Sequence, residues 1–139
     1  MEEMNDMSLF EGAADNADLL EKLLKASLIH AGETYQTPPQ IIWVDNSTIA
    51  TLGNFSASTG KAKSRKTFNV SALVAASLAN GKVLQYTAKL PDDKRKILYV
   101  DTEQSRFHCH SVMQRILRLA GLPDNMNSEN LVFFGLREY

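Results

Sequence analysis

The sequence contains one cysteine among its 139 residues, so no disulfide can form within the chain. A chain without disulfides fits a reducing compartment. The longest apolar run, residues 72–79, is interrupted by Ser77 and is far too short to span a bilayer. Residues 1–4 are acidic and lack the basic and apolar segments of a secretion signal. We therefore expect a soluble, cytoplasmic protein that does not associate with a membrane.

The sequence also lacks an excess of either charge and lacks a clustered set of metal ligands. Its 15 Lys and Arg residues and 16 Asp and Glu residues give a net charge of −1, which argues against general coating of nucleic acid. His108 and His110 are two residues apart, so on a helix they do not face each other and cannot share a metal ion. No second pair of Cys and His residues accompanies them, and we do not expect a zinc site. The length fits about one domain, and a composition that is 44% hydrophobic is enough for a core.

The positive charge that is present is concentrated in residues 60–67, which read GKAKSRKT. Gly60, Lys66 and Thr67 match the phosphate-loop pattern of Gly, four residues, Gly, Lys and Ser or Thr, whereas Arg65 replaces the second glycine. In that pattern, backbone amides and a helix N-terminus surround a phosphate, the Lys reaches the outer phosphates, and the hydroxyl binds Mg²⁺. We expect ATP and Mg²⁺ to bind here, with Thr67 as the metal ligand. The expected nucleotide-binding residues are Gly60, Lys61, Ala62, Lys63, Ser64, Arg65, Lys66, Thr67 and Phe68.

The first part of the chain is expected to be a helical arm rather than a domain. Residues 1–14 are expected to be a mobile start, and apolar residues that fall on one face predict a helix over residues 15–30. The breaker Thr37-Pro38-Pro39 follows. We therefore divide the chain into a flexible start with a helix, residues 1–33, and a nucleotide-binding core, residues 34–139.

The core is predicted to belong to the α/β class. Its expected strands, of which 83–90 could instead be a hairpin arm, span residues 41–44, 48–52, 55–59, 83–90, 97–100 and 131–134. Helices are expected directly after Thr67 and directly before Gly121. From residue 55 onward, strands and helices alternate, which is typical of a mainly parallel sheet covered by helices. Because ligands bind at the carboxyl ends of strands in such sheets, we expect residues 60–67 and 101–104 to lie at the same edge.

The segment that follows the predicted strand at residues 97–100 supplies the candidate catalytic group. A carboxylate near the γ-phosphate can orient and polarise an attacking water molecule, and we assign this role to Glu103. Alternatively, Asp101 and Glu103 begin a helix, where acidic residues favour the positive end of the helix dipole. The two interpretations are compatible with each other.

These motifs, at this separation, resemble the RecA-like ATPase core over about residues 48–139. The similar segments are GKAKSRKTF at residues 60–68, LYVDTEQ at residues 98–104 and GLREY at residues 135–139. The branches that this sequence resembles are the hexameric plasmid-replication helicases and the AAA-type ATPases of mobile elements in Bacteroidetes-like bacteria. The phosphate loop with Arg in place of Gly recurs in that group, so the resemblance makes Arg65 a family variant.

The resemblance implies a partial RecA-like three-layer sandwich that binds ATP and Mg²⁺, with Glu103 activating water and with Phe107 and His110 near the base. It also implies work on DNA in the replication or mobilisation of a mobile genetic element, and homo-oligomeric rings with sites between subunits. The family's next strand, which ends in an Asp on the magnesium side, has no counterpart here. We therefore expect the chain to be the N-terminal part of a longer ATPase or helicase.

Two other functions fit the same residues. A non-catalytic module would bind nucleic-acid phosphate through the cations of residues 61–66, with an affinity that falls steeply with salt and needs no Mg²⁺. A truncated remnant would pair through an exposed sheet edge with itself or with another chain. Salt dependence, gel filtration and a thermal-shift screen with nucleotides separate these alternatives.

Overall fold

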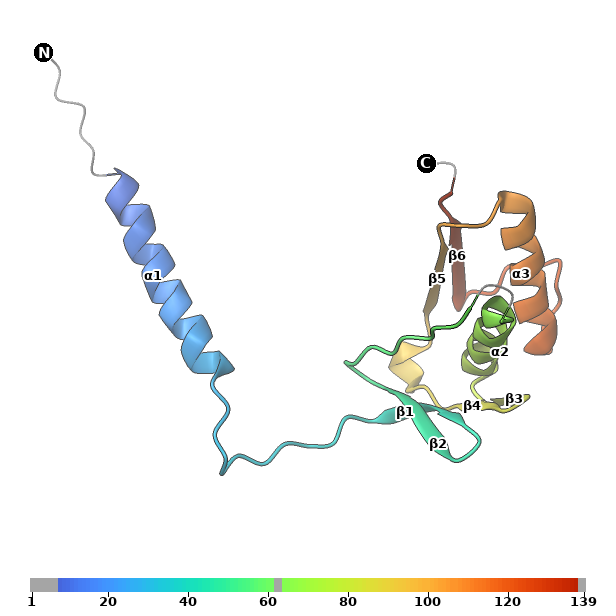
Figure 1. Cartoon of the computed structure of the whole chain (residues 1–139), viewed down its shortest axis with the longest axis horizontal. Coiled ribbons are helices and arrows are strands. Elements are labelled where there is room, and N and C mark those ends of the chain that lie inside the picture. The colour runs from blue at the N-terminus through green and yellow to red at the C-terminus, as the bar shows by residue number, and fades with distance from the viewer. Residues whose placement is uncertain (1–7, 62–63, 138–139) are drawn as a thin grey trace, which may run out of the picture. The chain divides into compact units, whose positions relative to one another are not determined.

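The computed structural model of the chain describes residues 8–61 and 64–137 (Figure 1). The chain divides into two compact units, Met1–Thr37 and Pro38–Tyr139. The first contains helix α1 (Ser8–Ser27), which begins and ends earlier than the predicted range of residues 15–30. Residues 8–14, expected to belong to a mobile start, are therefore helical, while residues 1–7 lie outside the described part. None of the helices in this described part is long and apolar enough to cross a bilayer.

The second unit begins with a four-stranded antiparallel sheet in the order β2-β1-β4-β3. Its strands are β1 (Gln40–Val44), β2 (Ser47–Thr51), β3 (Lys82–Val83) and β4 (Tyr86–Ala88). The predicted strands 41–44 and 48–52 are confirmed as the β1–β2 hairpin. Residues 83–90 contribute a second, shorter hairpin, in which β4 pairs with β1 so that Ile42 lies opposite Ala88.

A separate parallel pair consists of β5 (Ile97–Asp101) and β6 (Leu131–Gly135). Helix α3 (Arg106–Leu119) connects the two strands, and a short 3-10 helix (Asp92–Lys94) precedes β5. Tyr99 of β5 lies opposite Phe133 of β6, and their rings stack with centroids 4.3 Å apart. The predictions of these two strands and of the helix between them are confirmed.

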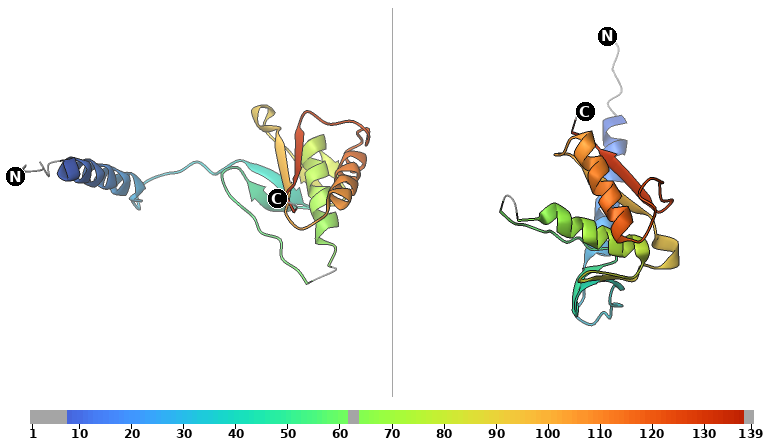
Figure 2. Two further views of the ribbon diagram at one scale, coloured as in Figure 1. Left: turned by 90° about the horizontal axis from the view of Figure 1, so that it is seen from above. Right: turned by 90° about the vertical axis from the view of Figure 1, so that its right-hand side faces the viewer.

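Helix α2 (Lys66–Ala79) is the central element of the hydrophobic core. It contacts α3, β3, β4 and β5, and Figure 2 shows it crossing α3. Ala72, Ala75 and Ala76 are fully buried, so their small side chains allow close approach of the neighbouring elements. Ile116 and Leu117 of α3 are likewise buried in this core. The position of the start of α2 is therefore set by packing along the whole helix.

The predicted strand at residues 55–59 is absent, and this segment has no regular secondary structure. Phe55 is 96% exposed, and the intervening Ser56 and Ser58 give the segment no apolar face to bury. Within the described residues, β5 pairs with β6 and with no other strand, so residues 55–59 do not pair with β5. The prediction of a mainly parallel sheet is wrong for the described residues, because three of their four strand pairings are antiparallel. The fold is mixed α/β.

Candidate functional site

The start of α2 and the loop after β5 line one hollow of about 310 Å³. Lys66 and Thr67 reach it from the first turn of α2, and residues 99–104 line it from the end of β5 and the following loop. Ser58 lines it from the irregular segment before the phosphate-loop pattern. The two segments predicted to share an edge thus meet, although one of them does not follow a strand. The hollow combines an ammonium group, a hydroxyl group and the carboxylate of Glu103.

Arg65 takes the left-handed backbone conformation, with φ 61° and ψ 25°, directly before α2. Glycine adopts this conformation freely, whereas other residues are strained by about 1–2 kcal/mol. The carbonyl oxygen of Arg65 accepts hydrogen bonds from the amides of Phe68 (3.0 Å) and Asn69 (3.1 Å), which begin the helix. Arg65 therefore turns the backbone at the position where the phosphate-loop pattern has its second glycine. Ala62 and Lys63, which were also predicted to bind nucleotide, lie outside the described residues.

Lys66 closes the loop by donating a hydrogen bond from Nζ to the carbonyl oxygen of Gly60, over 2.6 Å. Within the loop, the Ser64 amide donates to the carbonyl oxygen of Lys61 at 3.2 Å. A Cβ atom on Gly60 would lie 2.6 Å from Ser64 Oγ, so the glycine leaves room for that side chain. The ammonium group of Lys66 is exposed and held by a single carbonyl oxygen among the described residues, which makes it available to a phosphate oxygen.

Thr67 and Phe68 follow Lys66 but point to different surroundings. Thr67 is half-buried and lines the hollow, and its carbonyl oxygen accepts a hydrogen bond from Ser71 Oγ at 2.7 Å. Phe68 is not among the lining residues. The guanidinium carbon of Arg115, on α3, lies 5.9 Å from the centroid of the Phe68 ring, which is within cation–π range. Phe68 thus contacts α3, whereas Thr67 presents its side chain to the candidate site.

Asp101 organises the loop that carries Glu103. One carboxylate oxygen, Oδ1, accepts hydrogen bonds from the amides of Glu103 (3.0 Å) and Gln104 (2.8 Å), and Oδ2 accepts one from Gln104 Nε2 (2.7 Å). Burial alone would raise the pKa of Asp101, but these hydrogen bonds outweigh it and hold the pKa below its ordinary value. The aspartate is 8% exposed and charged, and Glu103 beside it is exposed.

The alternative in which Asp101 and Glu103 begin a helix is wrong, because α3 begins at Arg106 with Ser105 at its N-cap. The structural role of Asp101 in this turn was not predicted from the sequence. The signal was available, since an Asp side chain often bonds the amides two and three residues further along the chain and thereby fixes a turn. Glu103 is consequently presented by a turn rather than by a helix.

The donor groups in the hollow fit a magnesium ion that is held mostly by its substrate. Mg²⁺ usually takes one or two protein oxygen ligands together with substrate phosphates and water molecules. Thr67 offers a hydroxyl and Glu103 a carboxylate, while both carboxylate oxygens of Asp101 already accept hydrogen bonds. Within the described residues, no group of three or more His, Cys, Asp or Glu side chains could hold a metal by itself. Bound phosphate would therefore have to complete the coordination.

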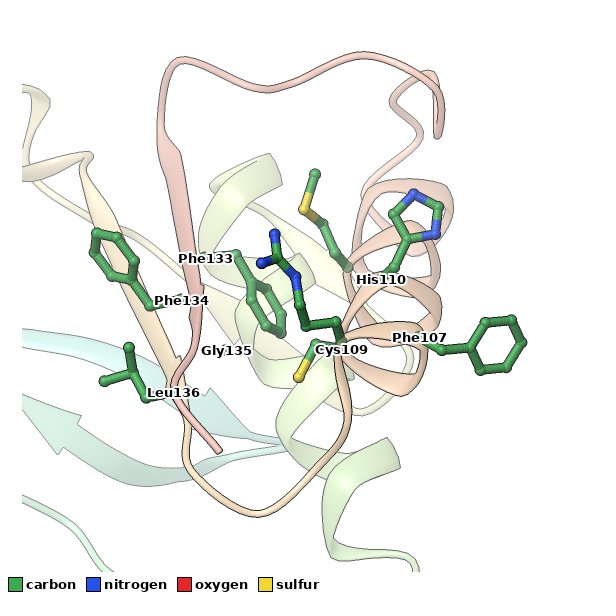
Figure 3. Close-up of a pocket in the computed structure, with 9 residues that line it drawn as sticks. Phe107, Cys109, His110, Phe133, Phe134, Gly135 and Leu136 are labelled. Atoms are coloured by element: carbon green, nitrogen blue, oxygen red, sulfur yellow. The ribbon is translucent and has the colours of Figure 1, made fainter. Parts of the chain in front are cut away.

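A second hollow, of about 660 Å³, lies between α3 and the end of β6 and is drawn in Figure 3. It is lined by Phe107 and His110, which the resemblance places near a base. In Figure 3, Phe133 points from β6 toward α3, whereas Phe107 points away from β6, and the latter is 75% exposed. Burial, and secondarily the charge of Asp101, raises the pKa of the Cys109 thiol in this hollow, so it stays protonated. No carboxylate is among the residues that line this hollow, and its polar side chains include Arg106 and His110.

A third hollow, of about 640 Å³, lies between α2 and the antiparallel sheet. It shares Ser58 and Val70 with the candidate site, and its other walls come mainly from aliphatic side chains of β1, β2 and α2. No charged residue lines it. Of these three hollows in the described part of the chain, the one that contains Lys66 is therefore the one that combines a cation, a hydroxyl group and carboxylates.

Comparisons of the chain with protein-family models, with curated proteins and with solved structures gave no significant match to any family, relative or fold.

Proposed function

We propose that this chain binds ATP with Mg²⁺ and is the phosphate-binding part of a RecA-like ATPase. The observation that carries the proposal is the meeting of Lys66, Thr67 and Glu103 around one hollow. These residues come from two segments separated by α2 and β5, and each was assigned a separate role in phosphate chemistry.

Each group has a distinct task in this proposal. The amides of Phe68 and Asn69 bond the carbonyl oxygen of Arg65, so the amides of Lys66 and Thr67 would bind the phosphate at the positive end of the helix dipole. Lys66 exchanges the carbonyl oxygen of Gly60 for an outer phosphate oxygen. Thr67 supplies a hydroxyl to the metal, and Mg²⁺ would neutralise charge on the phosphates. Glu103 orients the attacking water molecule, and Asp101 holds the turn that positions it.

The proposal extends to the fold and to the biological role. The order β5, α3, β6, with the two strands parallel and α2 packed against both β5 and α3, supports a RecA-like arrangement around this site. A three-layer sandwich needs further strands beside this pair. Work on DNA in the replication or mobilisation of a mobile element, in a homo-oligomeric ring, is supported by the resemblance of the motifs at residues 60–68, 98–104 and 135–139.

Isothermal titration calorimetry with ATP and Mg²⁺ tests the proposal. Lys66→Ala removes a charge-assisted hydrogen bond to phosphate and should weaken ATP binding about 10- to 100-fold. Lys82→Ala is the matched control, because Lys82 is equally exposed but lies in β3, beyond the other end of α2. Equal affinities for wild type and Lys66→Ala would overturn the proposal.

Glu103→Gln separates binding from catalysis at the same hollow. The substitution removes a negative charge but leaves the phosphate-binding groups in place. ATP affinity should therefore stay the same or rise slightly, while any phosphate release by the wild-type chain should be lost. A loss of affinity as large as that of Lys66→Ala would contradict the role given to Glu103.

The exposed cations Lys61 and Arg65 also suit the phosphates of a nucleic acid, so the same preparation should be titrated with oligonucleotides. Nucleic-acid binding would weaken steeply with salt and would proceed without Mg²⁺. ATP binding at the proposed site should instead depend on Mg²⁺. Tight, Mg²⁺-independent oligonucleotide binding together with no ATP binding would favour the non-catalytic module.

A further inference from the structure

The hollow between α2 and the antiparallel sheet (the sheet hollow) adjoins the hollow that contains Lys66 (the phosphate hollow). Ser58 and Val70 line both, so the two hollows meet between the irregular segment and α2. The volume of the sheet hollow is about 640 Å³, within the range of about 300–1,000 Å³ that is usual for small-molecule sites. All of its lining residues belong to the second unit, Pro38–Tyr139, so no residue of the first unit is needed to form it.

Helix α2 leads from one hollow into the other. Lys66, Val70 and Leu73 are three or four residues apart, so they lie on one side of the helix. Lys66 lines the phosphate hollow, Val70 lines both hollows, and Leu73 lines the sheet hollow. At 1.5 Å per residue, Leu73 lies about 10 Å further along the helix axis than Lys66. This side of α2 therefore suits a ligand that has phosphates at one end and an apolar group at the other.

The sheet hollow has the walls of a nucleoside site rather than those of a phosphate site. No charged residue lines it, and its aliphatic side chains include Ile42 and Leu73. Its polar side chains are uncharged and include Asn54, Asn69 and Tyr86. Tyr86 is 9% exposed, and its hydroxyl group makes no hydrogen bond to another described residue. Uncharged donors and acceptors in a mainly apolar cavity suit a heterocyclic base and a ribose.

From this continuity we infer that the sheet hollow holds the nucleoside of the nucleotide whose phosphates bind at Lys66. The inference rests on the proposed function and adds the part of the ligand that the phosphate hollow does not hold. It differs from the implication of the resemblance, which places Phe107 and His110 near the base. The hollow lined by those two residues shares no lining residue with the phosphate hollow, and α2 contributes none to it. The base is therefore assigned to the hollow that adjoins the phosphates.

Calorimetry of the full chain with two ligands, each in the presence of Mg²⁺, tests the inference. Inorganic tripolyphosphate has the phosphate chain of ATP but no nucleoside. Wild type should bind ATP at least about tenfold more tightly than tripolyphosphate, because ATP alone buries apolar surface in the sheet hollow. Equal affinities for the two ligands would overturn the inference and leave the phosphate site standing. Binding of neither ligand would overturn the proposed function and the inference with it.

Ala50→Trp tests the location of the nucleoside. Ala50 is half-buried, lies opposite Ile42 and lines the sheet hollow, so a tryptophan at this position would fill part of it. ATP affinity should fall about tenfold, toward that of tripolyphosphate. Tripolyphosphate affinity should stay unchanged, which also establishes that the variant is folded. Thr48→Trp is the matched control, because Thr48 is exposed on the same strand and lines neither hollow.

Two further variants keep the test decisive if Ala50→Trp does not fold. Ala57→Trp should have the same effect on ATP, because Ala57 lines the sheet hollow from the exposed irregular segment and lies outside the hydrophobic core. Phe107→Ala alters the hollow beside β6 and should leave ATP affinity unchanged. A tenfold loss of ATP affinity in Phe107→Ala, with tripolyphosphate affinity unchanged, would place the base in that hollow and overturn the inference. Folded tryptophan variants that bind ATP as tightly as wild type would also overturn it.

Discussion

At the scale of single residues, Arg65 shows that a left-handed backbone conformation can occur where the sequence has no glycine. The motif predicted the position at which glycine is missing, and the structure shows the left-handed conformation retained there. The conformation is imposed from outside the residue, because α2 is anchored by its buried alanines and its first amides bond the carbonyl oxygen of Arg65. Such strain persists only where the surrounding structure over-determines it. Residue spacing alone could not predict this.

We predict that nucleotide affinity follows the backbone preference of residue 65 rather than its charge. Arg65→Gly and Arg65→Asn, which both tolerate a positive φ, should bind ATP about as well as wild type. Arg65→Val, which is β-branched, should bind at least about tenfold more weakly and lower the free energy of unfolding by about 1–2 kcal/mol. Calorimetry and urea unfolding measure the two effects. Equal weakening by Gly, Asn and Val would instead assign the guanidinium group a direct contact with phosphate.

At the scale of elements, local sequence patterns predicted individual helices and strands but not the pairing of distant strands. The apolar periodicity of α2 and α3 and the short apolar runs of β5 and β6 were enough to place these elements. The pairing of β4 with β1 was not predicted, because it joins segments about 40 residues apart and no local signal encodes such a partner. The strand expected at residues 55–59 failed for the same reason, since a strand depends on its neighbours. The two segments that line the hollow could be recognised from the sequence because each is a short local motif, and the binding roles of their residues stay predictions.

The turn between β5 and α3 should make stability depend on pH through Asp101. Its pKa is lowered in the folded state, so its contribution is fully present above the unfolded pKa of about 3.9 and is lost as the pH falls below that value. Asp101→Asn keeps an acceptor for the two amides but cannot titrate. The stability of wild type should therefore fall more steeply than that of Asp101→Asn between pH 5 and pH 3, as measured by urea unfolding.

A matched substitution separates charge from hydrogen bonding in this turn. Asp101→Ala removes every acceptor and should cost about 1–3 kcal/mol at neutral pH, because the amides of Glu103 and Gln104 lose their partner. Asp93→Asn, in the exposed turn before β5, should leave the pH profile unchanged. Parallel pH profiles for wild type and Asp101→Asn would show that the carboxylate does not stabilise the turn through its charge.

At the scale of the whole molecule, the chain is organised as two units with different kinds of stability. The second, Pro38–Tyr139, has a hydrophobic core built from both sheets, α2 and α3. The first, Met1–Thr37, contributes no described residue to that core. The boundary between the units falls at Thr37-Pro38-Pro39, ten residues after α1 ends at Ser27. The division predicted from the sequence, between residues 33 and 34, lies four residues before this boundary.

We therefore predict that nucleotide binding needs only the second unit. A chain that lacks residues 1–37 should keep its cooperative thermal unfolding and its ATP affinity, because the core and the hollow lie entirely within residues 38–139. Lys66→Ala in this shortened chain should still weaken ATP binding about 10- to 100-fold. A shortened chain that unfolds, or that loses ATP affinity while folded, would show that the first unit supports the second.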